Sequence, residues 1–226
     1  MQANRAHPGL FVTFEGGEGS GKSTQFAQTA AFLIADGIPV TTTREPGGTE
    51  IGTAIRSFLL DAKNTTLVPT AELLLYEACR AQVTEEIIRP ALAQAHVVLC
   101  DRFFDSTTAY QGYARGLDLA MVQRLNLAAT SGLRPDCTLW FDMEPAAGIA
   151  RARARSGAAA LDRLEREALA FHERVRNGYR AIALAEPERV IRIDASRSIE
   201  VIQAEIQAIL RQQIAWRATH AMDKVA

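Results

Sequence analysis

The chain has 226 residues, of which 48% are hydrophobic and 23% are charged, as in ordinary globular proteins. Its formal net charge of −1 gives no reason to expect binding to nucleic acid or to an anionic membrane. No apolar run approaches the roughly 18 residues of a membrane span, and the N-terminus MQANRAHPG lacks the apolar core of a signal peptide. Cys79, Cys100 and Cys137 lie in apolar contexts without metal-ligand spacing, so we expect buried thiols in a cytoplasmic protein.

Patterns typical of strands and helices alternate along the chain, which predicts a parallel sheet covered by helices on both faces. We expect strands over residues 10–15, 39–43, 96–100, 137–141 and 190–193. The expected helices cover residues 22–36, 50–60, 70–95 (with Thr70 as N-cap and a bend at Pro90), 106–132 (broken near Gly112–Gly116), 145–155, 161–185 and 198–217. No repeat or low-complexity linker interrupts this pattern, so we expect one domain over residues 1–226.

The first expected strand runs into a glycine-rich loop and then into a helix, with the sequence LFVTFEGGEGSGKST. Gly16, Gly21, Lys22 and Ser23 match the phosphate-loop pattern G-x-x-x-x-G-K-[ST]. A glycine-rich surface turn is the alternative, but the strand before it and the helix after it favour the phosphate loop, whose amides surround anionic oxygens. Only three lysines occur in the chain, and one occupies the required position. We expect ATP to bind at Gly16, Gly17, Glu18, Gly19, Ser20, Gly21, Lys22, Ser23 and Thr24.

The second expected strand leads into Arg44-Glu-Pro-Gly-Gly-Thr49. The Pro-Gly-Gly run predicts a sharp turn that permits close backbone approach to a ligand. Arg44, together with Arg56 in the following helix, is a candidate for binding an acceptor monophosphate. A loop with a solvated arginine fits the pattern equally well, and composition does not choose between them.

Tyr76 and Arg80 are four residues apart, so they share one face of the next expected helix. A ring and a guanidinium on one face can stack on a nucleobase and donate hydrogen bonds to its carbonyl groups. From the spacing alone, the ordinary alternative of a half-buried core residue beside an extended arginine is favoured.

Asp101 and Arg102 follow the continuous apolar strand HVVLC. Sites in such sheets lie beyond the carboxyl ends of the strands, so Asp101 is expected near the phosphate loop. A carboxylate in this place, together with Ser23, would hold Mg²⁺, and Arg102 would bind phosphate. A helix cap beside a surface ion pair is the alternative, which the presence of a phosphate loop in the same sheet makes less favourable.

Arg151, Arg153 and Arg155 precede the small-residue stretch SGAAA and then Asp162-Arg163. Arg151 and Arg155 share a helix face, whereas Arg153 points elsewhere. A solvated charged face is the usual meaning of such a run. Because a small-residue hinge follows, we favour a lid over about residues 151–163 that brings arginine to the transferred phosphoryl group.

Together these motifs resemble the thymidylate kinase family over about residues 10–210. The stretches that discriminate it from other phosphate-loop proteins are Thr43–Thr49, Ile55–Asp61, Asp101–Gly116, Arg134–Asp142 and the RARAR run followed by LDRLE. The resemblance implies a P-loop NTPase fold with a five-stranded parallel sheet, like that of nucleoside monophosphate kinases. It also implies the reaction ATP + dTMP → ADP + dTDP with Mg²⁺, carried out by a homodimer whose helices near 70–95 and 118–132 pack together.

The resemblance assigns a role to each matching residue. Lys22 would hold ATP phosphates, Asp101 would serve the Mg²⁺ shell, and Arg44, Arg56 and Arg102 would bind the phosphate of dTMP. The rest of the nucleotide would meet Glu18 (sugar 3′-hydroxyl), Tyr76 (stacking), Arg80 (base), Thr107 and Gln111 (near the base) and Tyr110 (against the sugar 2′ position).

Two features depart from the family: a Tyr stands at position 76 where Phe is common, and the segment between Arg155 and Asp162 is longer. No arginine lies within Gly16–Ser23, which resembles the bacterial subtype, so a lid arginine (Arg151, Arg153 or Arg155) would be catalytic.

Two other functions remain open from the sequence. A kinase for another nucleoside monophosphate would share the phosphate loop and the Asp101-Arg102 pair, and the base pocket argues against it. A nucleotide-binding switch without transfer would leave the arginines at 44, 56, 80 and 102 unexplained. The acceptor phosphate is already ionised near neutral pH, so we expect catalysis by alignment and charge neutralisation without a strong general base.

Overall fold

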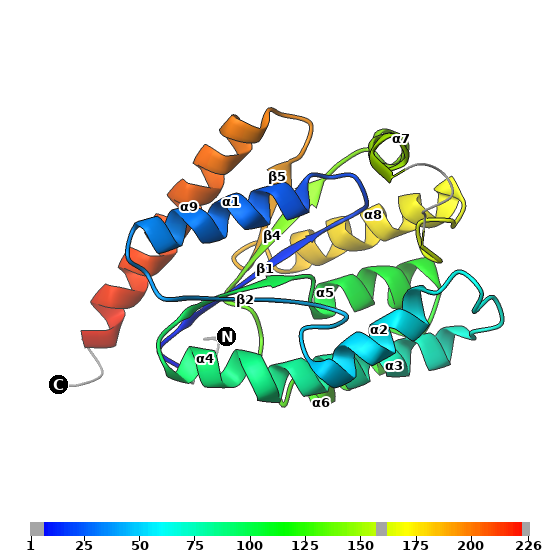
Figure 1. Cartoon of the computed structure of the whole chain (residues 1–226), viewed down its shortest axis with the longest axis horizontal. Helices are drawn as coiled ribbons and strands as arrows, with labels where there is room; N and C mark the ends of the chain where they lie inside the picture. The colour runs from blue at the N-terminus through cyan, green and yellow to red at the C-terminus, as the bar shows by residue number, and fades with distance from the viewer. Residues whose placement is uncertain (1–6, 157–161, 223–226) are drawn as a thin grey trace.

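The computed structural model describes residues 7–156 and 162–222 (Figure 1). Within them, five strands form one parallel sheet in the order β2-β3-β1-β4-β5, which confirms the predicted fold class. The strands are β1 (Leu10–Gly16), β2 (Val40–Arg44), β3 (Val97–Asp101), β4 (Cys137–Asp142) and β5 (Val190–Asp194). All five end one residue beyond the expected position, so β1 extends to the first glycine of the loop.

Strand β1 lies at the centre of the sheet, where the strand order reverses. It pairs with β3 on one side and β4 on the other, and Phe14 is in register with Asp101. The loop that leaves β1 therefore begins beside the residues that follow β3. In open α/β sheets this switch point is where ligands bind.

Helices cover both faces of the sheet (Figure 1). On one face α1 (Lys22–Ala35) and α9 (Ile199–Met222) enclose a core with Val12, Phe14, Leu33 and Ile206. On the other face the side chains of Phe11 and Val98 pack against the helices that follow β2. Alternate residues of the central strands thus enter opposite cores, as expected for a sheet buried on both sides.

The helix expected over 70–95 consists of three segments. They are α3 (Pro69–Val83), the π-helical segment η1 (Thr84–Ile88) and α4 (Arg89–Ala93). The predicted N-cap at Thr70 is wrong: Val68 caps α3, and Pro69 takes the first helical position, where its missing N–H costs no hydrogen bond. The widened η1 turn comes immediately before Pro90, whose ring cannot continue an ordinary α-helical turn.

Two other expected helices also differ from the structure. The region 106–132 divides into α5 (Phe104–Thr107), the π-helical η2 (Thr108–Ala114) and α6 (Leu119–Ala129), which is capped by Asp118. The helix expected from residue 161 begins later, as α8 (Leu169–Ala185). The side chain of Asp162 accepts from the backbone of Leu164 and Glu165, and this local turn replaces the start of a helix.

The remaining helices are α2 (Glu50–Leu60) and α7 (Pro145–Ser156). Thr49 caps α2 by accepting a hydrogen bond from the amide of Gly52, so the turn after β2 passes directly into this helix. All three cysteines are buried and free, as expected. Among the described helices, none is both long and apolar enough to cross a membrane.

Candidate active site

The loop after β1 turns sharply into α1. Gly16 and Gly21 have φ of +143° and +83°, and a Cβ on Gly16 would lie 2.6 Å from the carbonyl oxygen of Phe141. Only glycine fits there without displacing β4. Lys22 is the first residue of α1, and its Nζ lies 3.9 Å from Asp101 Oδ1. Burial and the neighbouring Arg102 lower the pKa of Lys22. A bound anion would therefore stabilise the charged form of this lysine.

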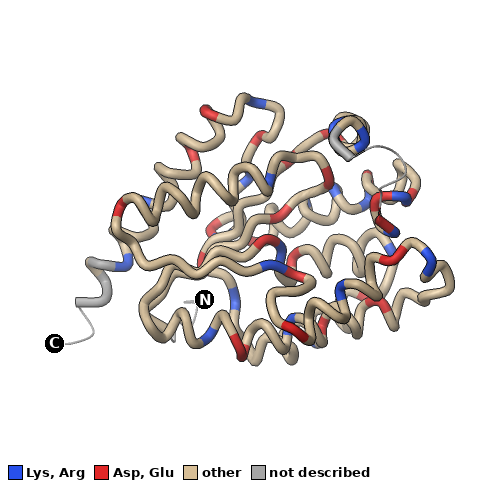
Figure 2. The backbone as a smooth tube through the Cα atoms, viewed as in Figure 1, with Lys and Arg blue, Asp and Glu red and all other residues tan. Residues whose placement is uncertain are grey.

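Arg102 joins the end of β3 to this loop. Its Nη2 lies 2.6 Å from Glu18 Oε1, and its Nη1 donates to the carbonyl oxygen of Gly16 at 2.8 Å. The guanidinium also lies over the Tyr110 ring, 5.3 Å from the ring centroid. Acidic and basic residues are mixed in this region near the carboxyl ends of the strands (Figure 2). Arg102 is therefore held by groups that a phosphate can replace.

A cleft with an empty volume of about 950 Å³, partly open to solvent, extends from Lys22 toward α3. It brings together all nine residues that the sequence analysis expects at the acceptor nucleotide. These are Glu18, Arg44, Arg56, Tyr76, Arg80, Arg102, Thr107, Tyr110 and Gln111. Lys22, Ser23 and Asp101 line the same cleft, so the two expected substrate sites adjoin.

Arg44 and Arg56 converge on one turn. A Cβ on Gly47 would lie 3.7 Å from Arg44 Cγ and 3.6 Å from Arg56 Cδ, so both side chains pass this glycine. Arg56 also donates to the carbonyl oxygen of Pro46 at 2.8 Å. Burial and the like charge of Arg44 lower the pKa of Arg56. Two guanidinium groups brought together in this way form a site for an anion.

Arg80 is 1% exposed and is surrounded by protein oxygens. Its Nε and Nη2 lie 2.9 and 2.8 Å from Glu45 Oε2, and Nη2 also donates to Thr107 Oγ1 at 2.9 Å. Its Nη1 donates to Asn126 Oδ1 and pairs with Glu77, both at 2.9 Å. Two buried carboxylates thus share one cation, and burial raises the pKa of Glu45 to about 8.

The far wall of the cleft comes from the end of the proposed lid and the residues that follow it. Asp162, Leu164 and Glu165 line it. Arg163 donates to the carbonyl oxygen of Leu59 at 2.9 Å and pairs with buried Glu72 at 2.5 Å, while Gln111 Nε2 donates to the same carboxylate at 2.7 Å. The segment is thereby attached to α2 and α3.

Two of the three expected lid arginines, Arg151 and Arg153, do not line the cleft. Arg151 Nη1 donates to the carbonyl oxygen of Ala195 at 3.4 Å, and Arg153 is exposed. The side chain of Arg155 and the hinge over 157–161 lie outside the described residues. Helix α7, which carries these arginines, packs directly on the loop after β1: a Cβ on Gly148 would collide with the carbonyl oxygen of Glu18. The position of α7 is therefore coupled to that of the loop.

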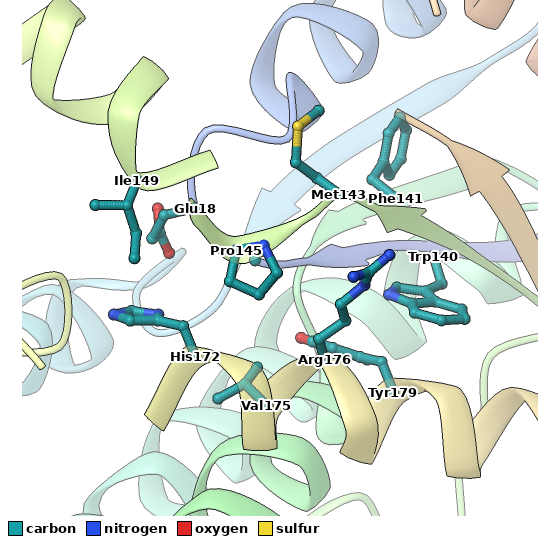
Figure 3. A pocket seen from close by; sticks show the side chains of 11 residues that line it. Glu18, Trp140, Phe141, Met143, Pro145, Ile149, His172, Val175, Arg176 and Tyr179 are labelled. Carbon is teal, nitrogen blue, oxygen red and sulfur yellow. The ribbon is translucent and has the colours of Figure 1, made fainter. Parts of the chain in front are cut away.

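A second, smaller cavity lies beneath the loop (Figure 3). Its walls come from the loop, the end of β4, α7 and α8, and Glu18 lines both cavities. His172 is 5% exposed, and its Nε2 has no hydrogen-bond partner among the described residues. Burial lowers the pKa of His172, which favours the neutral imidazole.

The sequence analysis did not include several residues that line the cleft. Glu45, Pro46, Leu60, Phe103, Ser106, Asp162, Leu164 and Glu165 belong to this group. For Glu45, which is 4% exposed in the structure, the available sequence signal was its place between Arg44 and the Pro-Gly-Gly turn. Pro46 lies in the turn after β2, and Leu60 ends α2. The others are brought to the cleft by the turn after β3 and by the segment 162–165, which periodicity does not reveal.

Comparison with known proteins gives one consistent result. A model of the thymidylate kinase family matches residues 14–206. A thymidylate kinase of Synechococcus sp. (strain JA-3-3Ab) is 49% identical over 205 residues, covering 91% of this chain and 97% of the relative. One of Desulfosudis oleivorans is 53% identical over 190 residues, covering 82% and 89%. The crystal structure of thymidylate kinase from Ehrlichia chaffeensis has a TM-score of 0.72 at 34% identity, covering 90% of this chain and 98% of that one.

Proposed function

The chain belongs to the thymidylate kinase family, and from that premise we propose which of its residues carry out the transfer of phosphate from ATP to dTMP. The cleft that contains Lys22 and Arg80 at its two ends is the proposed active site. The observation that carries this assignment is that the nine residues expected at dTMP line one continuous cleft together with Lys22 and Ser23 of the phosphate loop.

The phosphates of ATP bind the loop Gly16–Thr24, and Lys22 contacts the phosphoryl group that is transferred. The lowered pKa of buried Lys22 supports this role, because a bound polyphosphate would stabilise its charge. The N-terminus of α1 begins at the same residue, so its amide groups add to the field.

Asp101 and Ser23 are the proposed Mg²⁺ residues. Asp101 Oδ1 is buried and accepts no hydrogen bond within the described part of the chain. A carboxylate oxygen of this kind suits a hard cation such as Mg²⁺. Ser23 is exposed at the start of α1. Sites of this class hold Mg²⁺ mainly through phosphate oxygens and water, so two protein ligands suffice. A bound Mg²⁺ would neutralise charge on the phosphates.

The phosphate of dTMP lies among Arg44, Arg56 and Arg102. The lowered pKa of Arg56 beside Arg44 supports an anion at this position. Glu18, now paired with Arg102 at 2.6 Å, would be released toward the sugar 3′-hydroxyl when Arg102 turns to phosphate. Tyr110 lies against the sugar.

The base of dTMP lies between Tyr76 and Arg80. Arg80 donates to Thr107 Oγ1 in this structure, and a base carbonyl would replace that hydroxyl as the acceptor. Gln111 has its amide nitrogen bound to Glu72, which leaves its amide oxygen for the base. A thymine carbonyl and imino group would therefore meet a donor and an acceptor in fixed places.

The reaction needs alignment and charge neutralisation more than proton transfer. The attacking oxygen belongs to an ionised phosphate, so Lys22, Arg102 and one lid arginine (Arg151, Arg153 or Arg155) would stabilise the charge of the transition state. Because neither Arg151 nor Arg153 lines the cleft, the lid helix α7 would have to move for either of these two arginines to reach the phosphoryl group.

A homodimer in the cytoplasm completes the proposal. Apolar side chains are exposed on α3 and α6, with Leu74 51% and Leu127 59% accessible. Two such helices offer a surface that a second copy of the chain would cover.

The assignment is tested with a panel of nucleoside monophosphates and Mg-ATP. We expect rapid formation of dTDP from dTMP and poor turnover of dCMP and CMP, because an amino group at the base 4-position would face the donor Arg80. UMP should also react poorly, because its 2′-hydroxyl would meet Tyr110. Ready phosphorylation of dCMP would contradict the proposed base contacts while leaving the phosphate assignments intact.

A further inference from the structure

A carboxylate that the proposed mechanism does not use lies directly behind the cleft. Glu15, near the end of β1, is 0% exposed. It accepts hydrogen bonds from the backbone N–H of Phe103 at 2.7 Å, the hydroxyl of Ser106 at 2.5 Å and the hydroxyl of Tyr179 at 2.9 Å. A buried carboxylate needs such partners, but the choice of partners has a consequence for the site.

All three donors surround Arg102. Phe103 follows it in the chain, and Arg102 Nη1 lies 3.2 Å from Ser106 Oγ and 3.4 Å from the hydroxyl of Tyr179. The two hydroxyl oxygens are 2.8 Å apart, so they form one cluster with the carboxylate. Figure 3 shows Tyr179 on α8, in a part of the fold distant in sequence from both β1 and β3.

The backbone of Arg102 is also held from β1. Its φ of +71° is a left-handed conformation, which is strained for a residue with a side chain. Such strain persists where the surroundings fix it. The N–H of Arg102 donates to the carbonyl oxygen of Phe14 at 3.0 Å, and the next N–H in the chain donates to Glu15. The end of β1 therefore fixes the peptide on each side of the strained residue.

The charge of Glu15 also decides the direction of the hydrogen bonds. A hydroxyl has one hydrogen to donate and lone pairs to accept with. Since the hydroxyl groups of Ser106 and Tyr179 donate to Glu15 Oε2, their lone pairs remain for the N–H groups of Arg102. An amide or a protonated carboxyl at position 15 would donate a hydrogen bond to the hydroxyl group of Ser106 or Tyr179. That hydroxyl would then direct its own hydrogen toward the guanidinium of Arg102.

We propose that Glu15 is a positioning residue for Arg102: it touches neither substrate, but it fixes the turn and the hydroxyl groups that aim the guanidinium at the acceptor phosphate. The inference rests on the proposed role of Arg102. Asp142 offers a matched comparison, because it is also a buried carboxylate near the carboxyl end of a strand, 4% exposed, and pairs instead with Arg176 and Arg192, each at 2.7 Å.

The ionisation of Glu15 gives a readout that a purely structural role would not move. Burial and the charge of Asp105 raise its pKa to about 7, against the opposing effect of Arg102 and the hydrogen bonds. The other ionisable groups that interact with it are Lys22 on α1, Glu45 after β2, Cys100 on β3, Tyr110 on η2 and Tyr179 on α8. The ionised form is the one that orients Arg102, so turnover should fall as the pH drops below about 7.

The experiment measures kcat/KM for dTMP with saturating Mg-ATP between about pH 5.5 and 9 for the wild type, Glu15→Gln and Asp142→Asn. For Glu15→Gln we expect about a tenfold loss of kcat/KM at high pH. The acid-side midpoint should move from about 7 toward about 6, where only the substrate phosphate still titrates. Asp142→Asn should keep the wild-type midpoint. Unchanged rate and midpoint in Glu15→Gln, or an equal shift in Asp142→Asn, would overturn the proposal.

Tyr179→Phe keeps the test decisive if Glu15→Gln does not fold. It removes one oriented hydroxyl without uncovering a charge, and we expect a loss of about three- to tenfold in kcat/KM with a smaller effect on kcat/KM for ATP. A rate within twofold of the wild type would refute the proposal. Arg102→Ala separates the two levels of inference: near-normal turnover in that variant would contradict the assignment of Arg102 itself. Strong impairment beside normal Tyr179→Phe and Glu15→Gln would refute only the role of Glu15.

Discussion

The two ends of the cleft hold their cations in different ways. At the phosphate end, Lys22 lies 3.9 Å from Asp101, and Arg102 has contacts with Glu18 and Gly16 that are open to exchange. At the base end, every guanidinium nitrogen of Arg80 lies 2.8–2.9 Å from a protein oxygen, and the side chain is 1% exposed.

This difference matches two tasks. Side chains that bind the phosphoryl group during its transfer need partners that a phosphate can displace. Their hydrogen bonds must be donated to the transition state instead of to the protein. A group that reads a base gains from being fixed in advance, since a rigid donor rejects a mismatched base through an unpaired hydrogen bond. We therefore expect substitutions at the phosphate end to affect kcat, and those at the base end to affect stability and selectivity.

The largest effect is expected for Lys22→Ala. Removing this lysine of the cleft should lower kcat by about a thousandfold or more, because a charge that neutralises the transferred phosphoryl group is lost. The melting temperature should change little, since the pKa of Lys22 is already lowered by burial in the folded protein and its charge is not strongly stabilised there. Steady-state kinetics and calorimetry check both points, with Lys63→Ala, a lysine outside the cleft, as control. A loss below tenfold would contradict the assignment.

A scan of the lid arginines comes next. Arg151→Ala, Arg153→Ala and Arg155→Ala are measured separately, and one of them should lower kcat by about a hundredfold while leaving KM for dTMP nearly unchanged. Since the side chain of Arg151 now contacts the carbonyl oxygen of Ala195, a large effect there would show that α7 rotates during turnover. Three variants with normal kcat would remove the lid from the proposed chemistry.

Arg80→Met tests the base end. Two buried carboxylates, Glu45 and Glu77, would lose their common cation, and breaking such a buried pair costs about 3–5 kcal/mol. Denaturant unfolding should show that loss together with a higher KM for dTMP. The matched control is Arg115→Met, whose 18%-exposed side chain pairs with Glu72 and Glu167 and whose loss should cost less, because Arg163 also pairs with Glu72.

The different fates of the predictions have physical reasons. The strand order and the meeting of the loop after β1 with Asp101 follow from an alternating pattern and a rule about sheet edges, so both could be expected from the sequence. The prediction of a helix from residue 161 is wrong, because the Asp162 side chain forms a local turn with the backbone that competes with the helix. That every guanidinium nitrogen of Arg80 has a protein oxygen as partner could not be predicted from the sequence. It depends on Glu45 and Asn126, which lie 35 and 46 residues away in the sequence.

The two buried carboxylates that pair with Arg80 predict a dependence of stability on pH. Burial raises the pKa of Glu45 to about 8 and also raises that of Glu77, so the folded protein binds more protons than the unfolded chain between the ordinary carboxyl pKa and about 8. Stability should therefore fall as the pH rises through this window, by the linkage relation. Glu77→Gln leaves one carboxylate for Arg80 and should flatten the slope. The measurement is thermal unfolding of the wild type and Glu77→Gln at several pH values. If the stability of Glu77→Gln declines with pH as steeply as that of the wild type, the raised pKa of Glu77 does not contribute to the slope.

The smallest effect is expected for Tyr76→Phe, and it sharpens the contrast between the two ends. Tyr76 lines the cleft and is 9% exposed, so its ring can act as a stacking surface whether or not it carries a hydroxyl. If the base end works through a fixed ring and a fixed guanidinium, KM for dTMP should stay within about threefold in Tyr76→Phe. It should rise about tenfold or more in Tyr76→Ala, because stacking on an aromatic ring contributes about 1–3 kcal/mol. A large change in Tyr76→Phe would mean that the hydroxyl binds the nucleotide directly, and that the base end, like the phosphate end, relies on a polar group with exchangeable partners.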